Sequence, residues 1–140
     1  MIVRDGPKPG HPIDSVPRPD RPTVSVVIPV HGHQPLIAEQ LAALAAQTYP
    51  HLLEVLVCDN GCDEPTLDLV SDYAAGVPGL RTVDARDRPG ASFARNRGVE
   101  QAKGELIAIC DSDDVVSPGW VEVLSRAAHH AEIVGGHVDF

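Results

Sequence analysis

The chain has 140 residues, is 43% hydrophobic and carries a formal net charge of −9. This length and apolar content suit one domain with a real core, and the acidic balance argues against a surface that binds nucleic-acid phosphates. No stretch approaches the roughly 18 consecutive apolar residues that span a bilayer, and no basic start with an apolar block predicts a signal peptide.

Residues 1–22 hold six of the 13 prolines and show no hydrophobic period. We therefore predict a flexible, Pro-rich arm there, followed by a domain over residues 23–140. The domain opens with a continuous apolar run at residues 23–30, which is typical of a strand buried on both faces. Apolar residues then recur at helical spacing and predict a helix from Pro35 to about Gln47.

Strand and helix continue to alternate along the rest of the chain. Asp63 is expected to cap the second helix, Ser92 the third, and Ser117 the fourth, with Pro118 in its first turn. Further strands are predicted at residues 53–59, 80–85, 105–111 and 132–140. This alternation predicts an α/β domain with a mostly parallel sheet and helices on both faces.

Three predicted strands end in polar residues, and the carboxyl ends of parallel strands are where open α/β sheets bind ligands. If the backbone stays extended beyond Cys110, Asp111 and Asp113 project to the same side. Two such carboxylates favour Mg²⁺ or Mn²⁺ with positions left open for substrate phosphates. The alternative is a polar loop in which each aspartate, including Asp114, caps a turn or the next helix.

Other polar residues each have a functional and a simpler interpretation. Gly90 before a helix could receive an anion, and Arg95 could reach an acidic ligand or be an ordinary solvated charge. His31 and His33 could bind a metal, but a turn that needs Gly32 explains the pair more simply. The three cysteines suggest reduced thiols in a cytoplasmic protein, and zinc lacks a second Cys/His pair at matching spacing.

Four segments, taken in chain order, resemble glycosyltransferase family 2: "VSVVIPVHG", "EVLVCDNGCDEPT", "GASFARNRGVEQAKGELIAICDSDD" and "SPGWVEVLSRAAHHAEIVGG". The resemblance implies the Rossmann-like GT-A nucleotide-diphospho-sugar transferase fold, truncated here. It also implies metal-assisted transfer of a sugar with inversion. The donor would be a nucleotide-diphosphate sugar, and a UDP-sugar is the first choice. The acceptor would be a hydroxyl of a saccharide, lipid or protein.

The resemblance also implies roles for individual residues. The nucleotide would contact Pro29, His31, Asp59, Arg95 and Asp111, with Asp59 at the base and Asp111 at the ribose or the metal. Asp113 would coordinate Mg²⁺ or Mn²⁺. The chain departs from the family pattern at His31, where an aromatic residue is usual, at Gly32 (Asn), at Asn60 (often Asp) and at Cys62 (Ser).

Family members continue through an acceptor-binding half, so the general base is expected beyond Phe140 and this chain would be the donor-binding half. The alternatives are a non-catalytic nucleotide-binding or interaction module, and a phosphatase with an aspartate nucleophile. A truncated sheet leads us to expect self-association. Attachment to the inner face of a membrane, through parts outside this chain, is left open.

Overall fold

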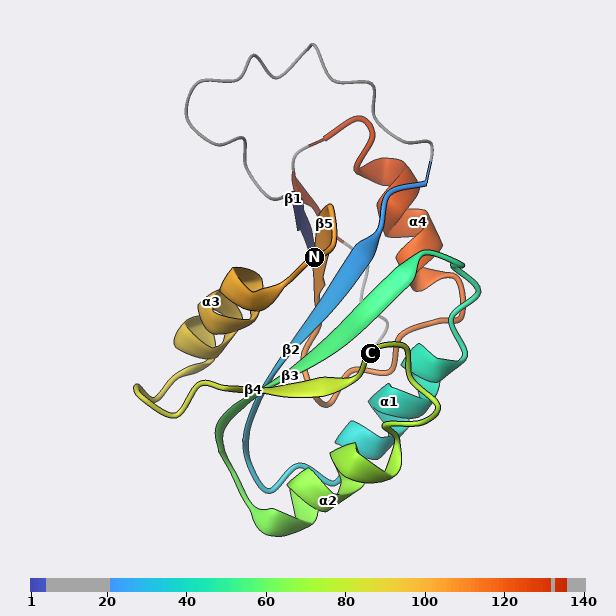
Figure 1. The fold of residues 1–140 in the computed structure, drawn as a ribbon. Helices are drawn as coiled ribbons and strands as arrows, with labels where there is room; N and C mark the ends of the chain where they lie inside the picture. Colours follow the sequence, from blue (N-terminus) through green and yellow to red (C-terminus); the bar gives the residue numbers. More distant parts are fainter. Residues whose placement is uncertain (5–20, 132, 136–140) are drawn as a thin grey trace.

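The computed structural model describes residues 1–4, 21–131 and 133–135. Figure 1 shows a twisted sheet between helices. The strands are β1 (Ile2–Arg4), β2 (Val24–Gly32), β3 (Leu52–Cys62), β4 (Arg81–Asp84), β5 (Leu106–Ile109) and β6 (Ile133–Val134). The helices are α1 (Ile37–Ala45), α2 (Glu64–Asp72), α3 (Ala91–Gln101) and α4 (Trp120–Ala127). Among these residues no helix has both the length and the apolar character required to cross a bilayer.

The sheet has six strands in the order β4-β3-β2-β5-β1-β6. β2 pairs in parallel with β3 and with β5, and β3 pairs in parallel with β4. β1 is antiparallel to both β5 and β6. The mostly parallel sheet expected from the alternating pattern is therefore confirmed.

The ends of the chain differ from the sequence-based expectation. Ile2–Arg4 was expected in a flexible arm but forms β1, whose backbone pairs with that of β5, with Ile2 opposite Ala108. Three residues are too few to show a hydrophobic period, while the edge of β5 offers unpaired backbone groups. The rest of that arm, residues 5–20, lies outside the described residues. So does most of the predicted last strand, of which only β6 is described.

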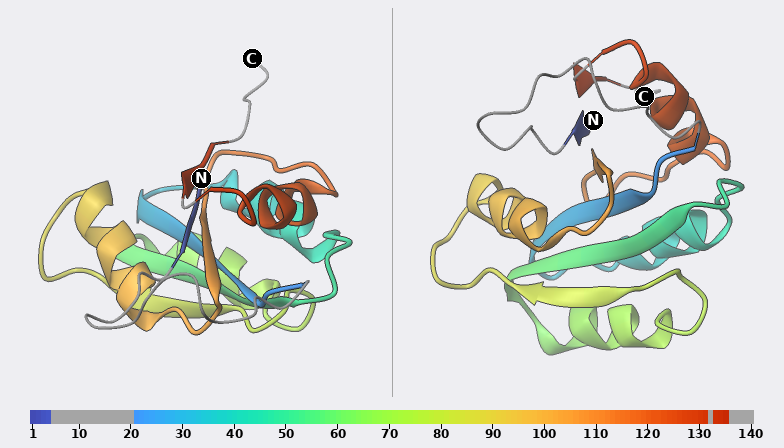
Figure 2. Two further views of the ribbon diagram at one scale, coloured as in Figure 1. Left: turned by 90° about the horizontal axis from the view of Figure 1, so that it is seen from above. Right: turned by 45° about the horizontal axis from the view of Figure 1, so that its top comes forward.

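Two hydrophobic clusters cover the two faces of the sheet. Val26 and Ile28 of β2 belong to the larger cluster and Val27 between them to the smaller one, because successive side chains of a strand point to opposite faces. The larger cluster joins the sheet to α1, α2 and α4, and the smaller one joins it to α3. Figure 2 shows α3 on the opposite side of the sheet from α1 and α2. Helices on both faces, as predicted, leave the strand ends as the accessible edge.

Two of the predicted helix starts are wrong. α3 begins after Gly90, not at a Ser92 cap, and Gly90 has a φ of 122° that favours glycine. α4 begins after Gly119, not at Ser117. The carbonyl oxygen of Ser117 instead accepts hydrogen bonds from Gln47 Nε2 and from Trp120 N. The predicted cap of α2 is confirmed, because Asp63 Oδ1 accepts a hydrogen bond from Thr66 N at 3.0 Å.

α3 lies directly on the sheet because its residue 98 is glycine. A Cβ added there would stand 2.4 Å from Val27 Cγ1 and 2.6 Å from Cys58 Sγ. These distances are far inside the roughly 3.5–4.0 Å of ordinary contact. Only a residue without a side chain permits this approach of helix and strands.

The far end of α3 is joined to the sheet by the buried carboxylate of Glu54. Its oxygens accept hydrogen bonds from Lys103 N at 2.7 Å, from Ser25 Oγ at 2.8 Å and from Arg81 Nη2 at 3.2 Å. Burial by itself would raise the pKa of Glu54, but these bonds and the Arg81 charge outweigh it, so the pKa is lowered. A single ionised side chain thus joins β2, β3, β4 and the segment after α3.

Candidate functional site

The candidate site lies at the carboxyl ends of the parallel strands. β3 and β4 lie on one side of β2, whereas β5 lies on the other. The order in which strands are added to the sheet therefore reverses between β2 and β5. Open α/β sheets bind ligands at such a point. β2 ends here with His31 and Gly32, and Asp59 and Asn60 lie near the end of β3. Asp111 follows β5 by two residues.

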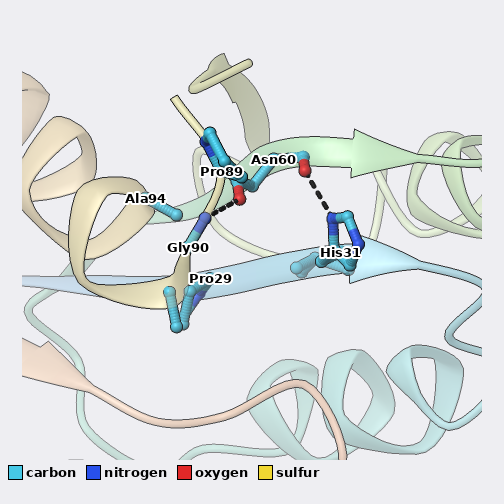
Figure 3. A pocket seen from close by; sticks show the side chains of 8 residues that line it. Pro29, His31, Asn60, Pro89, Gly90 and Ala94 are labelled. Atoms are coloured by element: carbon cyan, nitrogen blue, oxygen red, sulfur yellow. Dashed lines mark hydrogen bonds between the residues drawn. The ribbon is translucent and has the colours of Figure 1, made fainter. Parts of the chain in front are cut away.

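A pocket of about 290 Å³ opens at this edge (Figure 3). Its lining residues come from the end of β2, the end of β3 and the start of α3: Pro29, Val30, His31, Asn60, Pro89, Gly90, Ala91 and Ala94. The sequence-based candidates Pro29 and His31 therefore share one cavity. The other nucleotide and metal candidates are not part of its lining. Gly90, which the sequence offered as a possible anion site, also lines the pocket, whereas Asn60, Ala91 and Ala94 are contributors that the sequence did not reveal.

Hydrogen bonds connect the two walls of the pocket through Asn60. Its Nδ2 donates to Ala85 O and, at 2.7 Å, to Arg88 O. Its Oδ1 accepts from Gly90 N at 2.7 Å. On the other wall, the backbone oxygen of Asn60 lies 2.6 Å from His31 Nδ1, so this ring nitrogen carries the proton and donates. Figure 3 shows the bonds to Gly90 and His31.

Asp59 is buried at the end of β3, next to the pocket. Its Oδ1 accepts hydrogen bonds from Gly61 N at 2.9 Å and Cys62 N at 2.8 Å, which fixes the turn after the strand. Its Oδ2 is 3.8 Å from Arg86 Nε. The same arginine donates to both oxygens of Asp84 and holds the pKa of that carboxyl well below its usual range. One oxygen of Asp59 is thus occupied by the turn, and the other is left for a ligand or Arg86.

The acidic cluster after β5 differs from the expected extended strand. β5 ends at Ile109, and Ser112 and Asp113 form a turn. Asp111 and Asp113 are nevertheless both exposed, with the buried Ser112 between them. Asp114 accepts a hydrogen bond from Asp111 N at 3.0 Å through Oδ2. The polar-loop interpretation therefore describes Asp114, while Asp111 and Asp113 remain exposed.

Arg95 connects this cluster to the pocket. Its Nη2 donates to Asp111 Oδ1 at 2.8 Å, and it follows the pocket residue Ala94 on α3. The structure therefore brings together Arg95 and Asp111, two candidates that are 16 residues apart in the sequence. Within the described part of the chain, no hydrogen bond or ion pair involves the side chain of Asp113.

Within the same residues, no group of three or more His, Cys, Asp or Glu side chains is placed to hold a metal. Asp111 and Asp113 offer two carboxylates, which are hard oxygen ligands. Mg²⁺ or Mn²⁺ often takes one or two carboxylates from a protein while a bound ligand supplies further oxygens. The residues present thus fit a divalent ion completed by ligand oxygens, not a site built from protein alone.

The other metal interpretations find no support in the geometry. His31 binds the backbone at Asn60, whereas His33 Nδ1 lies 2.7 Å from Asp63 Oδ2, so the two imidazoles have separate partners. Gly32 between them has a φ of 65°, as the simpler turn interpretation requires. Burial is the main cause that raises the pKa of the Cys58 and Cys62 thiols to about 12, so both stay protonated at neutral pH.

Comparison with known proteins gives a consistent result. Residues 25–140 match the family model described as glycosyl transferase family 2. Glycosyltransferase AglE of Haloferax volcanii is 34% identical over 122 residues, which are 85% of this chain and 40% of AglE. Glycosyltransferase GlyG of Streptococcus pneumoniae is 26% identical over 120 residues, or 84% of this chain and 40% of GlyG. The chain thus spans less than half the length of these relatives.

Two solved structures show the same architecture. S. aureus TarS superposes with a TM-score of 0.68 at 28% identity, over 76% of this chain and 19% of TarS. The mannosyltransferase PcManGT of Pyrobaculum calidifontis, solved with GDP-Man and Mn²⁺, gives a TM-score of 0.64 at 32% identity, over 83% of this chain and 34% of PcManGT. TarS residues 1–349 have also been solved with UDP and with UDP-GlcNAc.

Proposed function

The chain belongs to glycosyltransferase family 2, and on that premise we propose that it binds the donor of a sugar transfer, a nucleotide-diphosphate sugar with uridine as its nucleoside. The sugar would pass to an acceptor hydroxyl with inversion at the anomeric carbon. The observation that carries the proposal is the pocket at the carboxyl edge of the sheet, joined through α3 to the Arg95–Asp111 pair. TarS and PcManGT, whose solved complexes hold UDP-GlcNAc and GDP-Man, support a nucleotide-diphosphate sugar as the donor, and TarS alone of the two supports uridine.

Each candidate residue then has a stated task. Pro29 and His31 would form the surface against which the nucleoside packs, since both line the pocket. Asp59 would accept a hydrogen bond from the base through Oδ2, because its Oδ1 already accepts two backbone bonds. Arg95 would face the phosphates, where its positive charge offsets theirs.

Asp111 and Asp113 would hold Mg²⁺ or Mn²⁺. When bound, such an ion supplies positive charge that stabilises the departing diphosphate. Asp113 would contribute a carboxylate without other partners among the described residues, and Asp111 a carboxylate that is now paired with Arg95. Competition between Arg95 and the metal for Asp111 is therefore part of the proposal.

Isothermal titration calorimetry with UDP and with GDP, each with and without Mn²⁺, tests this function. We expect UDP to bind in the presence of Mn²⁺ and EDTA to weaken that binding. Asp113→Ala should abolish the metal dependence while the melting temperature stays equal or rises slightly, because removing one carboxylate relieves repulsion. Asp68→Ala, an exposed aspartate on α2, is the matched control and should bind like the wild type.

Two results would count against the proposal. The absence of binding heat with every nucleoside diphosphate and metal would remove the donor site altogether. Nucleotide binding without hydrolysis of the donor or transfer to an acceptor would favour the non-catalytic module instead.

A further inference from the structure

The side chain of Asn60 holds the segment that leads into α3. The residue is 5% exposed, and the three hydrogen bonds of its side chain within the described residues all go to the segment between β4 and α3, at Ala85, Arg88 and Gly90. An amide has two N–H donors and one carbonyl oxygen, and both ends are used here. This side chain therefore fixes the segment at three points along six residues.

The bond to Gly90 determines where α3 begins. Gly90 is the N-cap of α3, and no side chain caps this helix. Its φ of 122° is available to glycine at little cost, so the local backbone alone does not select a single direction for the chain. The hydrogen bond from Gly90 N to Asn60 Oδ1 fixes the direction of the chain at this point. Pro89, Gly90 and Ala91, which form one wall of the pocket, are thereby placed.

The opposite wall depends on the same residue through its backbone. A backbone oxygen can only accept, so the 2.6 Å contact makes His31 Nδ1 the donor and fixes one orientation of the imidazole. Cβ placed on Gly61, the next residue, would stand 3.4 Å from His31 Nδ1, so the ring also packs closely against this turn. Displacement of the strand end at Asn60 would therefore move both walls together.

We propose that Asn60 is a positioning residue for binding of the nucleotide sugar, and that it needs both ends of its amide: Oδ1 accepts from Gly90 N, and the two N–H groups donate to Ala85 O and Arg88 O. The identity of the ligand rests on the proposed function, whereas the positioning role rests on the hydrogen bonds of Asn60. An aspartate has nearly the same shape as Asn60 and keeps an acceptor for Gly90 N. It would, however, turn a carboxylate oxygen toward the carbonyl oxygens of Ala85 and Arg88. The amide is therefore required in this chain.

The affinity test uses Asn60→Asp with Gln101→Glu as its control. Gln101 is an exposed amide at the other end of α3, so the control makes the same chemical change and adds the same charge away from the pocket. At pH 8 we expect Asn60→Asp to bind UDP with Mn²⁺ about tenfold more weakly than the wild type, or worse, and Gln101→Glu to bind equally well. Equal affinity of Asn60→Asp and the wild type, or equal losses in the two variants, would overturn the inference.

A pH series separates the loss of donors from a general loss of structure. A protonated carboxyl has an O–H that donates, so the ratio of variant to wild-type dissociation constants should fall as the pH is lowered from 8 to 5.5. Damage to the fold would give a ratio that stays constant or rises toward acid pH. That result would overturn the role of the amide donors.

Hydrogen exchange at Gly90 N in the ligand-free protein distinguishes failure of this inference from failure of the proposed function. Asn60→Ala removes the acceptor, and we expect the Gly90 amide to exchange about tenfold faster or more while the amides of β3 stay protected. If the wild type binds no nucleotide but this exchange is accelerated, the proposed function is wrong and the positioning role stands. If exchange at Gly90 is unchanged, the positioning role is wrong whatever binds.

Discussion

Gly98→Ala is the substitution that tests most directly how α3 is held against the sheet. The new methyl carbon would stand 2.4 Å from Val27 Cγ1, 3.2 Å from Val27 Cγ2 and 2.6 Å from Cys58 Sγ. Two of these contacts are more than about 1 Å shorter than van der Waals contact. Val27 and Cys58 are fully buried, so neither can move into solvent to make room.

Two effects of opposite sign decide the result. Alanine favours an α-helix over glycine by about 1 kcal/mol. Overpacking of a closed interior costs about 1–3 kcal/mol, and contacts this short belong at the upper end of that range. The steric cost is therefore the larger effect, and we expect a net loss of about 1–2 kcal/mol in the free energy of unfolding. For a chain of this length that corresponds to a melting temperature roughly 3–8 °C lower.

Thermal unfolding followed by circular dichroism measures this loss. Gly76→Ala is the control, because the nearest atom to its added Cβ is 3.9 Å away, and it should leave the melting temperature unchanged or slightly higher. Val27→Ala removes both of the closest carbons, so its own cost should be smaller in the Gly98→Ala background than in the wild type. A Gly98→Ala variant as stable as the wild type would show that α3 does not approach the sheet as described.

Two further predictions concern titratable groups in the core. Glu54→Gln should lower the free energy of unfolding by about 1–3 kcal/mol at pH 7. Because the folded pKa of Glu54 is below its ordinary value of 4.5, its stabilisation is complete above that pH and is lost as the pH falls through the folded pKa. Chemical denaturation between pH 3 and 7 should therefore show a flatter pH profile for the variant, and parallel profiles would contradict this. Cys58, with its pKa raised to about 12 by burial, should not react with a thiol reagent at pH 8 until denaturant unfolds the protein, and rapid labelling of the native state would contradict its burial.

The parallel core of the fold could be predicted from the sequence because its signal is strong and local. The β-branched, mostly apolar run before Pro29 is typical of a strand buried on both faces, and β2 indeed lies in the interior of the sheet. The N-cap at Asp63 was predicted for a similar reason, since a short acceptor before a helical period has few alternatives. β1 could not be found in this way, because its three residues are selected by the free edge of β5 and not by any pattern of their own.

The candidate site was predictable in its location and less so in its parts. Topology places the ends of β2, β3 and β5 at one edge, so Pro29, His31 and Asp59 could be located there from their positions alone. The role of Asn60 could not be read in the same way, because its partners are backbone groups up to 30 residues further on in the sequence. A signal did exist, however: an amide followed by Gly61 at a strand end indicates a sharp turn whose backbone groups need hydrogen-bond partners. The extended geometry assumed after Cys110 failed because Asp114 closes a turn there.

Ala94 lies in the wall of the pocket and also in the smaller hydrophobic cluster beneath α3. The methyl group of Ala94 thus borders both the cavity and the packed interior. Any bulkier residue there would narrow the cavity and at the same time lift the helix from the strands. A substitution at Ala94 is therefore expected to change the shape of the cavity and the packing of α3 on the sheet together.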